Sequence, residues 1–492
     1  MPRLRVTVDN RVRLPLVNLP GSLMDELSGA FSYANPQHQK LKAMGYGTKG
    51  EPAVIRTWRD EGGCLTVPRG GMARVRDALR RYGVAYEVAD ERAQGEGHGE
   101  IPDSLQKPWP FQDACAAALI ARENALLRAP TGGGKSSIGI SIAARLKVPT
   151  CFIVWNSGLF EQWRARLQKE LGLREKDVGV IKAGKWNLKP VTVAMQQTLC
   201  AKEQIPAEVN RYFGCVISDE VQRSAADTCF AVTDQFRARY RFGISASELR
   251  RDGKEFITRD LFGDVAAEVD REQLVREGFI LDVEIEVIPT RFEAPWYGHP
   301  SEGGELDVNR LLDELTNDAE RNGQVIAAAL QAVAAGEQVI VLSRRVEHCK
   351  LLCRMLVAEG VTTGFLLGGA DNRLEFRRSV AGLGTGEIRA GVGTYEALGT
   401  GIDLPSVSVG IASTPILGNR QFFNQVRGRV CRTAPGKQAA RLVYLWDRAV
   451  HPAHLRNAVS WNPSVSVLTR GGEWVDGRAA VAGLRSGAVR TA

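Results

Sequence analysis

Short apolar runs alternate with amphipathic stretches along most of the chain after residue 105. In the first half, the apolar runs are CFIVW at 151–155, VTVAM at 191–195, FGCVIS at 213–218 and RYRFGIS at 239–245. The stretch LFEQWRARLQKEL, which follows the first run, has the spacing of a surface helix. Such an alternation predicts a parallel sheet with helices on both faces, because the runs are too apolar for strands that face water.

The second half repeats this pattern, whereas the first 92 residues do not. Residues 1–92 mix short β-like runs with one helical segment over 72–82, which predicts a small α+β domain. The expected order is an N-terminal domain at 1–92, a glycine-rich linker at 93–104, α/β domains at 105–282 and 283–460, and a tail at 461–492. The composition of that tail favours disorder.

The segment APTGGGKSS lies between an apolar run and a helical pattern in the first α/β domain. It comprises Ala129, Pro130, Thr131, Gly132, Gly133, Gly134, Lys135, Ser136 and Ser137. Glycines allow backbone N–H groups to approach a phosphate, and the following helix directs its positive end at the same charge. Lys135 is then expected to reach the β- and γ-phosphates of ATP, and Ser136 to bind Mg²⁺. The alternative is a glycine-rich turn without a ligand.

Three further groups of residues suit a nucleotide site. Gln112 follows an aromatic residue about twenty positions before the loop, where it can hydrogen-bond adenine. Asp219 and Glu220 end a strongly apolar run, so Asp219 can hold Mg²⁺ and Glu220 can orient or deprotonate the attacking water. Ser245, Ala246 and Ser247 end another run, where hydroxyl groups can link two sites through hydrogen bonds.

The second α/β domain lacks a phosphate loop but has its own charged positions. Gly401 and Asp403 end the run GTGID, and Gln425, Arg429 and Arg432 follow at spacings of four and three. On a helix these three side chains would share one face. Two arginines there suit phosphate or transition-state charge, and an exposed basic helix is the alternative.

The charge and cysteine content of the chain predict a polyanionic partner and a reducing compartment. The 492 residues carry a net charge of +8, and residues 1–92 hold 15 Lys and Arg against 10 Asp and Glu. The helix expected over 72–82 is basic, with Arg74, Arg76, Arg80 and Arg81 mostly away from its apolar face. This helix could contact a nucleic-acid backbone together with Lys40, Lys42, Lys49, Arg56, Trp58 and Arg69. Nine scattered cysteines without a CxxC pair, and the lack of an apolar leader or membrane span, predict a cytoplasmic protein. His348, Cys349 and Cys353 are interpreted as buried side chains rather than metal ligands.

Taken in order, Gln112, APTGGGKS, DEVQ, SAS, GTGID and QVRGRVCR resemble the motifs of superfamily 2 helicases, most closely the branch that holds XPB and UvsW. The resemblance implies two tandem RecA-like P-loop domains that sandwich ATP, with a small α+β N-terminal accessory domain. It further implies that Lys135 and Ser136 bind phosphate and Mg²⁺, that Asp219 and Glu220 form the acidic pair, and that Arg429 and Arg432 are arginine fingers beside Gln425.

The sequence departs from this branch at three places. Gln222 stands where the branch has histidine and would contact the γ-phosphate, and Ser247 must supply the hydroxyl of the usual threonine. Arg250, Arg251 and Asp252 retain only part of an Arg-Glu-Asp element. The function implied is an ATP-dependent helicase or translocase acting on duplex or branched DNA in replication, recombination or repair. The alternatives are an RNA helicase, and an ATP-switched subunit of a restriction or defence complex that acts through partner proteins.

Overall fold

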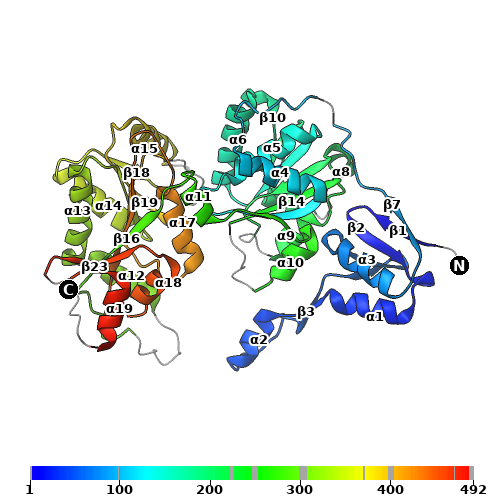
Figure 1. Ribbon diagram of the computed structural model, residues 1–492, viewed down its shortest axis with the longest axis horizontal. Helices are drawn as coiled ribbons and strands as arrows, with labels where there is room; N and C mark the ends of the chain where they lie inside the picture. The colour runs from blue at the N-terminus through cyan, green and yellow to red at the C-terminus, as the bar shows by residue number, and fades with distance from the viewer. Residues whose placement is uncertain are drawn as a thin grey trace. The chain divides into compact units, whose positions relative to one another are not determined.

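The fold is that of a computed structural model, which divides the chain into two compact units. It describes residues 3–97, 99–202, 204–221, 226–246, 253–297, 307–368, 372–396, 404–469 and 471–486. Unit 1 spans Met1–Arg271 and unit 2 spans Glu272–Ala492. Figure 1 shows the described elements of both units, each of which is built around its own large sheet.

The sheet of unit 1 has eight strands in the order β11-β10-β12-β9-β13-β14-β8-β15. All neighbouring strands are parallel except β10 and β11. The central strands are buried on both faces, as their apolar sequences predict. The strands are β8 (Asn124–Arg128), β9 (Thr150–Val154), β10 (Val178–Lys182), β11 (Lys185–Asn187), β12 (Val191–Met195), β13 (Cys215–Ser218), β14 (Tyr240–Ser245) and β15 (Val265–Glu268).

Helices α5 and α6 pack over this sheet with Trp163, whose ring stacks on Phe152 at 4.5 Å between ring centroids. The helix α11 (Arg271–Arg276) begins at Arg271, the last residue of unit 1. The connecting helices of unit 1 are α4 (Pro110–Arg122), α5 (Lys135–Leu146), α6 (Ser157–Leu171), α7 (Gln196–Cys200), α8 (Ala207–Tyr212), α9 (Ala226–Thr233) and α10 (Glu255–Phe262). The predicted alternation of strands and helices is therefore present.

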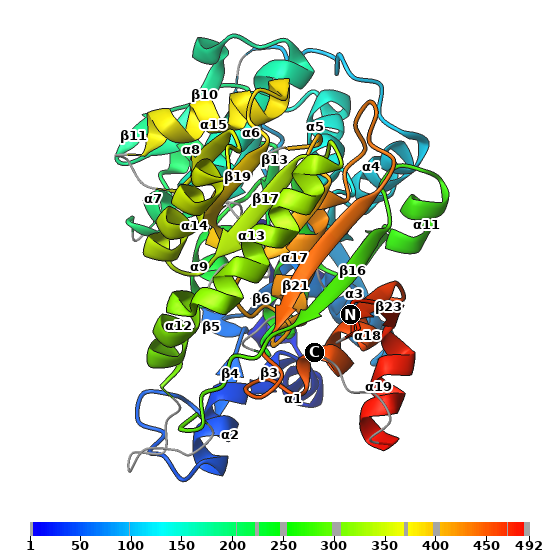
Figure 2. The ribbon, with the colours of Figure 1, turned by 90° about the vertical axis from the view of Figure 1, so that its left-hand side faces the viewer.

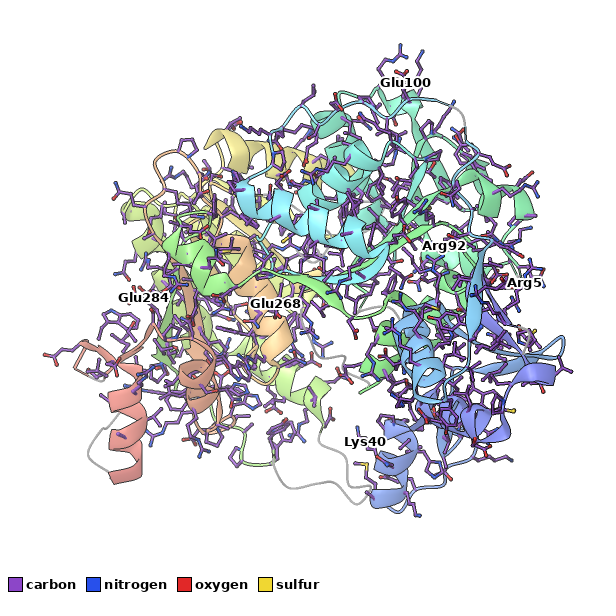
Figure 3. All side chains as sticks on the ribbon, turned by 45° about the vertical axis from the view of Figure 1, so that its right-hand side comes forward. Arg5, Lys40, Arg92, Glu100, Glu268 and Glu284 are labelled. Carbon is purple, nitrogen blue, oxygen red and sulfur yellow. The ribbon has the colours of Figure 1, made fainter. Side chains whose placement is uncertain are left out.

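An N-terminal module precedes this sheet and has its own small core. Its five strands have the order β5-β6-β2-β1-β7, and a two-stranded ribbon, β3-β4, carries α2. In Figure 3, Lys40 marks α2, which projects away from the module's sheet. The elements are β1 (Leu4–Val8), β2 (Arg11–Pro15), α1 (Gly21–Ala30), β3 (Ser32–Ala34), α2 (Pro36–Ala43), β4 (Val54–Arg56), β5 (Arg59–Glu61), β6 (Cys64–Pro68), α3 (Met72–Arg81) and β7 (Tyr86–Asp90).

Buried charges attach this module to the rest of unit 1. Arg11 forms an ion pair with Asp234, and both side chains are almost fully buried. Arg74 and the Thr57 hydroxyl both donate to Asp260 of α10, which has no exposed surface. Buried charges of this kind are tolerated because each is paired. The module and the first large sheet are therefore one unit.

Arg69 corrects one expectation about the module. It was expected to contact a nucleic-acid backbone, but it is only 3% exposed. Its guanidinium donates to the carbonyl oxygen of Ala238 at 2.6 Å and to Oδ1 of Asn124 at 3.0 Å. Sequence alone could not separate this arginine from the surface ones, because its partners lie 55 and 169 positions away.

The segment predicted as a linker lies along unit 1 and is hydrogen-bonded to it. The backbone N–H groups of Ala93 and Glu96 donate to the carbonyl oxygens of Arg237 and Arg211. Ile101 is buried in the core of the first large sheet. This segment shows no apolar periodicity because its backbone is extended and is held mainly by main-chain hydrogen bonds.

The sheet of unit 2 also has eight strands, in the order β18-β19-β17-β20-β21-β16-β22-β23, and only β22 and β23 are antiparallel. Figure 2 shows β16 beside β21, with α13 and α14 over one face. The strands are β16 (Val283–Pro289), β17 (Val339–Ser343), β18 (Thr363–Leu366), β19 (Ala390–Thr394), β20 (Val409–Ala412), β21 (Ala440–Trp446), β22 (Val465–Leu468) and β23 (Trp474–Asp476).

Helices cover this sheet as well, and they continue into the expected C-terminal tail. They are α12 (Val308–Asn317), α13 (Ala319–Ala334), α14 (Val346–Ala358), α15 (Arg373–Thr385), α17 (Arg420–Val430), α18 (His454–Trp461) and α19 (Gly477–Ser486). Disorder was expected for residues 461–492, yet β22, β23 and α19 lie there. Four-residue strands carry little sequence signal, and β22 is held by parallel pairing with β16.

The described residues contain neither a membrane-spanning helix nor a metal-binding cluster. No helix among them is both long enough and apolar enough to cross a membrane. Nor does any cluster of three or more potential metal ligands occur in that part of the chain. Cys349 and Cys353 are buried in the core of unit 2, and His348 hydrogen-bonds Ser343 and Asn322.

Candidate functional site

The glycine-rich loop joins β8 to α5 at the carboxyl end of the first sheet. Gly132 and Gly134 have φ values of +90° and +73°, in the left-handed region that glycine adopts at least cost. A Cβ atom at Gly134 would lie only 2.1 Å from Nε2 of Gln112. Gly134 caps α5 without a side-chain hydrogen bond, so the first N–H groups of this helix have no side-chain cap. The loop therefore has the backbone of an anion cradle.

Lys135 is the first residue of α5, and its ammonium lies between the loop and a carboxylate. Its Nζ atom is 3.4 Å from the carbonyl oxygen of Ala129 and 3.3 Å from Oε1 of Glu220. The Lys135 and Glu220 side chains are 11% and 15% exposed, so both retain some access to solvent. The structure thus brings together the predicted phosphate-binding lysine and the predicted catalytic carboxylate.

Asp219 directly follows β13 and is held by two hydrogen bonds. Its Oδ2 accepts from Nε1 of Trp163 at 2.8 Å, and its Oδ1 accepts from the backbone N–H of Glu220 at 2.8 Å. Burial, with the nearby Glu220 charge, raises the pKa of Asp219 to about 6, although Lys135 and the Trp163 hydrogen bond oppose the shift. Glu220 has φ of +50°, an uncommon backbone conformation for a non-glycine residue.

Gln112 lies beside the loop rather than apart from it. It is 6% exposed, and its Oε1 accepts from the backbone N–H of Trp109 at 3.0 Å, at the start of α4. Its amide nitrogen faces Gly134, as the short distance to an added Cβ shows. The adenine contact remains a prediction, but the packing of Gln112 against the phosphate loop was not anticipated from sequence.

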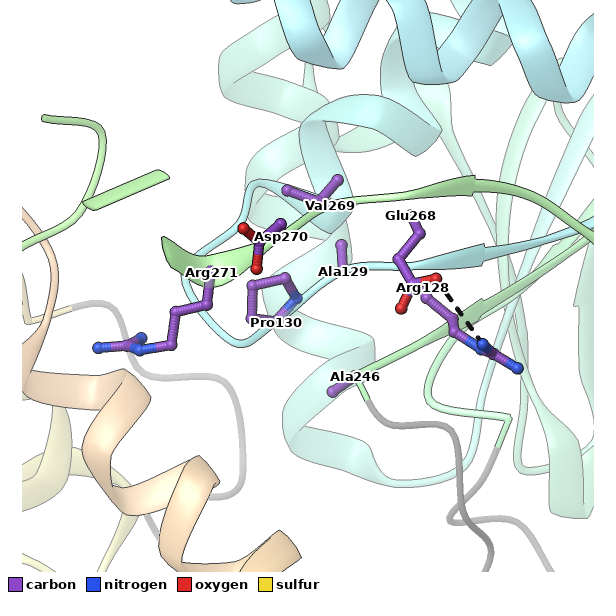
Figure 4. A pocket seen from close by; sticks show the side chains of 8 residues that line it. All are labelled: Arg128, Ala129, Pro130, Ala246, Glu268, Val269, Asp270 and Arg271. Carbon is purple, nitrogen blue, oxygen red and sulfur yellow. Dashed lines mark ion pairs between the residues drawn. The ribbon is translucent and has the colours of Figure 1, made fainter. Parts of the chain in front are cut away.

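The strand that carries the serine motif is bonded to the start of the loop. The backbone N–H of Ala129 donates to the carbonyl oxygen of Ser245 at 3.0 Å. Ala246 lines a pocket of about 390 Å³ with Ala129 and Pro130 (Figure 4). Arg128 and Glu268 also line this pocket and form an ion pair at 3.8 Å. Displacement of the strand end would therefore be transmitted to the phosphate loop.

Two supporting residues were missed by the sequence analysis. Trp163 holds Asp219, and Glu170 accepts a hydrogen bond from the Ser137 hydroxyl at 3.3 Å. Burial raises the pKa of Glu170, which is only 3% exposed. Both residues lie on α6, where Trp163 reads as an ordinary core residue. A glutamate on the buried face of an amphipathic helix was the one available signal.

Known proteins are similar in sequence to this chain. The family model described as "Type III restriction enzyme, res subunit" matches residues 106–248. The probable helicase D10 of Escherichia phage T5 is 26% identical over 376 residues, which cover 73% of this chain and 75% of that protein. A DNA 3'-5' helicase XPB of Kineococcus radiotolerans is 26% identical over 389 residues, which cover 77% of this chain and 66% of the relative.

The resemblance to superfamily 2 helicases of the XPB type is confirmed. The fold is confirmed by a solved structure of S. cerevisiae Dbp5 bound to RNA and ADP BeF3. It aligns with a TM-score of 0.53 at 14% identity, over 74% of this chain and 90% of that one. The chain thus has two tandem RecA-like domains with a small α+β domain before them. The match spans about two thirds to three quarters of the two helicase relatives.

The helicase motifs of unit 2 are only partly described. Arg429 lies on α17 and is half-buried, but α17 ends at Val430, so Arg432 lies beyond the helix. The expectation that Arg429 and Arg432 share one helical face is therefore wrong. Backbone pairing of Arg432 with Ile280 accompanies this early end of the helix. Gln222, Ser247, Arg250, Arg251, Asp252, Gly401 and Asp403 lie outside the described residues, as does the side chain of Gln425.

The described residues of unit 1 fit a nucleoside triphosphate with Mg²⁺. An uncapped helix terminus, a lysine and glycines suit the phosphates, and a hydroxyl and a carboxylate at Ser136 and Asp219 are oxygen donors of the kind Mg²⁺ prefers. Asp219 keeps acceptor capacity beyond its two hydrogen bonds, because an ionised carboxylate has about four lone-pair sites.

Proposed function

We propose that this chain is an ATP-dependent DNA helicase or translocase that remodels duplex or branched DNA. The observation that carries the proposal is the ion pair of Lys135 and Glu220 at the mouth of the glycine-rich loop, beside Asp219. The relative named a DNA 3'-5' helicase XPB supports DNA as the substrate. A role in replication, recombination or repair is also part of the proposal, and it rests on the resemblance to helicases of the XPB type.

The proposal gives each residue a step in hydrolysis. Phosphate in the loop would replace Glu220 as the partner of Lys135, and the carboxylate of Glu220 would then be free to orient or deprotonate water. Ser136 and Asp219 would hold Mg²⁺, which would neutralise charge on the β- and γ-phosphate oxygens. Arg429 and Arg432 would supply positive charge to the transition state, and Gln112 would bind adenine.

Coupling to DNA would begin at the serine motif. The hydrogen bond from Ala129 to Ser245 ties the loop to the end of β14, and the proposed coupling residues Ala246 and Ser247 follow directly. On the N-terminal module, α2 presents Lys40 and Lys42, with Tyr46 60% exposed just beyond it. These cations would bind the DNA backbone, so binding should weaken steeply with salt.

The test is the ATP hydrolysis rate measured with no nucleic acid, single-stranded DNA, duplex DNA, a forked junction and RNA, at one salt concentration. Stimulation should be largest with duplex or branched DNA. Lys135→Ala should lower the rate at least about 100-fold, because the cation at the transferred phosphate is lost. Lys169→Ala, an exposed lysine on α6, is the matched control and should retain the wild-type rate. A rate in Lys135→Ala near that of this control would refute the site.

A second candidate is the motor subunit of a restriction complex. It is favoured by the family model matched by residues 106–248, whose description names the res subunit of a type III restriction enzyme. This candidate predicts stable association with a nuclease or methyltransferase on purification. Strongest stimulation by RNA in the experiment above would instead favour an RNA helicase.

A further inference from the structure

The ammonium of one lysine of unit 2 lies among four carbonyl oxygens from two separate segments. The Nζ atom of Lys437 is 3.1 and 2.6 Å from those of Pro405 and Val407, and 2.6 and 2.8 Å from those of Val430 and Arg432. Its three N–H groups serve these four acceptors, so one N–H is shared between two of them. We call these five residues the Lys437 clamp. No sequence motif pointed to Lys437, and the proposed hydrolysis does not use it.

The Lys437 clamp joins the segment after Asp403 to the end of α17, and both lie near residues proposed for ATP hydrolysis. Pro405 and Val407 lie two and four residues after Asp403 in sequence, and Val430 is the last residue of α17. The carbonyl groups at the end of a helix lack intrahelical partners, and a cation placed there also meets the negative end of the helix dipole. The ammonium therefore satisfies the end of α17 and the segment after Asp403 together.

Local backbone geometry directs Lys437 to this position. A turn returns the chain after Arg432: the N–H of Lys437 donates to the carbonyl oxygen of Ala434 at 3.1 Å, and Gly436 has φ of +78°. From the other side, the N–H of Leu281 donates to the carbonyl oxygen of Cys431 at 2.7 Å. The backbone at Arg432 is thus held by two independent contacts.

We propose that Lys437 is a positioning residue, which ties the segment after Asp403 to the end of α17 and thereby fixes Arg432. Burial lowers the pKa of Lys437 to about 8, with Cys431 and Arg432 as the ionisable neighbours, so its charge is retained at neutral pH. The effect on hydrolysis rests on the proposed function, whereas the tie between the segments does not.

The tie is tested by hydrogen exchange in Lys437→Met, which keeps an unbranched side chain one atom shorter and removes every donor. Backbone amides of residues 404–409 and 426–432 should exchange faster together in this variant. Lys350→Met, which removes an exposed lysine paired with Glu347 on α14, is the matched control and should leave both segments unchanged. Unchanged exchange, or faster exchange in one segment only, would overturn the clamp.

The functional consequence is tested by steady-state ATP hydrolysis in the presence of DNA. We expect Lys437→Met to lower kcat about tenfold with little change in KM for ATP, because fixing Arg432 matters in the transition state. Lys437→Arg should recover part of kcat, since it keeps the charge with a different shape. Leu352→Ala, a core truncation on α14, should lower stability but not the kcat of folded protein.

The outcomes separate this inference from the proposed function. If Lys437→Met loses stability while its kcat per folded molecule equals that of the wild type, Lys437 is structural and the positioning role is refuted. If the wild type shows no hydrolysis stimulated by any nucleic acid, the proposed function fails, and the exchange experiment still decides whether the clamp exists.

Discussion

Two carboxylates at strand ends, one in each unit, show how the same fold can serve chemistry or stability. Asp219 follows β13 in unit 1, next to Glu220 and Lys135, whose side chains are 15% and 11% exposed. Asp447 follows β21 in unit 2 with no exposed surface. It accepts from Nε of Arg321 at 2.8 Å and from the Thr290 hydroxyl at 2.7 Å, and Arg321 is likewise fully enclosed.

The two sites differ in whether their charged groups can still bind a ligand after they have formed their contacts within the protein. Arg321 also donates to the carbonyl oxygen of Ser413, so the contacts of this enclosed pair are made with protein groups. Such a pair costs desolvation energy and mainly holds neighbouring elements in place. In unit 1 a lysine and a carboxylate face each other at a loop that can accept an anion, so the pair can be exchanged for substrate. A carboxylate at a strand end is therefore not a site by itself.

The largest effect should come from removing the carboxylate charge in unit 1. Glu220→Gln should lower kcat for ATP hydrolysis by about 100- to 1000-fold, because water loses its base while the side-chain volume is kept. The free energy of unfolding should change little. Steady-state hydrolysis and urea unfolding measure the two quantities. Glu208→Gln, an exposed glutamate of α8, serves as the control, and equal rates in the two variants would contradict the role of Glu220.

Removing the carboxylate charge of Asp447 in unit 2 should instead lower stability. Asp447→Asn leaves the buried Arg321 without a counter-charge and should destabilise unit 2 by about 3–5 kcal/mol. Urea unfolding followed by a probe in unit 2 measures this. Asp313→Asn, which removes an exposed partner of Arg345, should cost less than about 1 kcal/mol. Similar costs for the two variants would show that burial of the pair is unimportant.

The smallest expected effect is the pH dependence of ATP hydrolysis that Asp219 of unit 1 causes. Because the pKa of Asp219 is raised to about 6, hydrolysis should fall about tenfold per unit below that pH as the Mg²⁺ ligand is protonated. The stability contribution has the other sign: a raised folded-state pKa favours the protonated fold, so this contribution is present below about pH 4 and is lost as the pH rises through 6.

Acid should therefore inactivate the protein reversibly, because protonation of Asp219 lowers activity without favouring unfolding. A second variant tests the assignment. Trp163→Phe removes a hydrogen bond that lowers the pKa of Asp219, so the acidic midpoint of kcat/KM should move to higher pH. A midpoint that does not move would assign the acidic limb to another group.

Much of the fold and of the site was predictable because the signals are local. The strands at 191–195 and 240–245 follow from apolar runs, and the helix over 72–82 from its periodicity. The roles given to Lys135 and Glu220 required only the glycine-rich loop and the acidic pair. The structure adds that their charged atoms lie 3.3 Å apart, although the two residues are 85 positions apart in sequence.

The errors all concern contacts between distant segments. Arg69 looked like the other basic residues of the module, and only its buried partners distinguish it. Arg432 matched a helical spacing, but the helix ends two residues earlier. The strand β22 has too few residues to stand out, yet pairing with β16 places it in the sheet.

By itself, the sequence determined the type of each large domain, the phosphate loop and the acidic pair, because periodicity and glycine spacing act over a few residues. Only the tertiary structure decided which charges are open to a ligand and which are enclosed, as for Lys135 with Glu220 and for Arg321 with Asp447. It also decided that one ammonium, that of Lys437, joins two segments. The physical reason is that desolvation and pairing of a charge depend on every element packed around it, and these elements come from all parts of the chain.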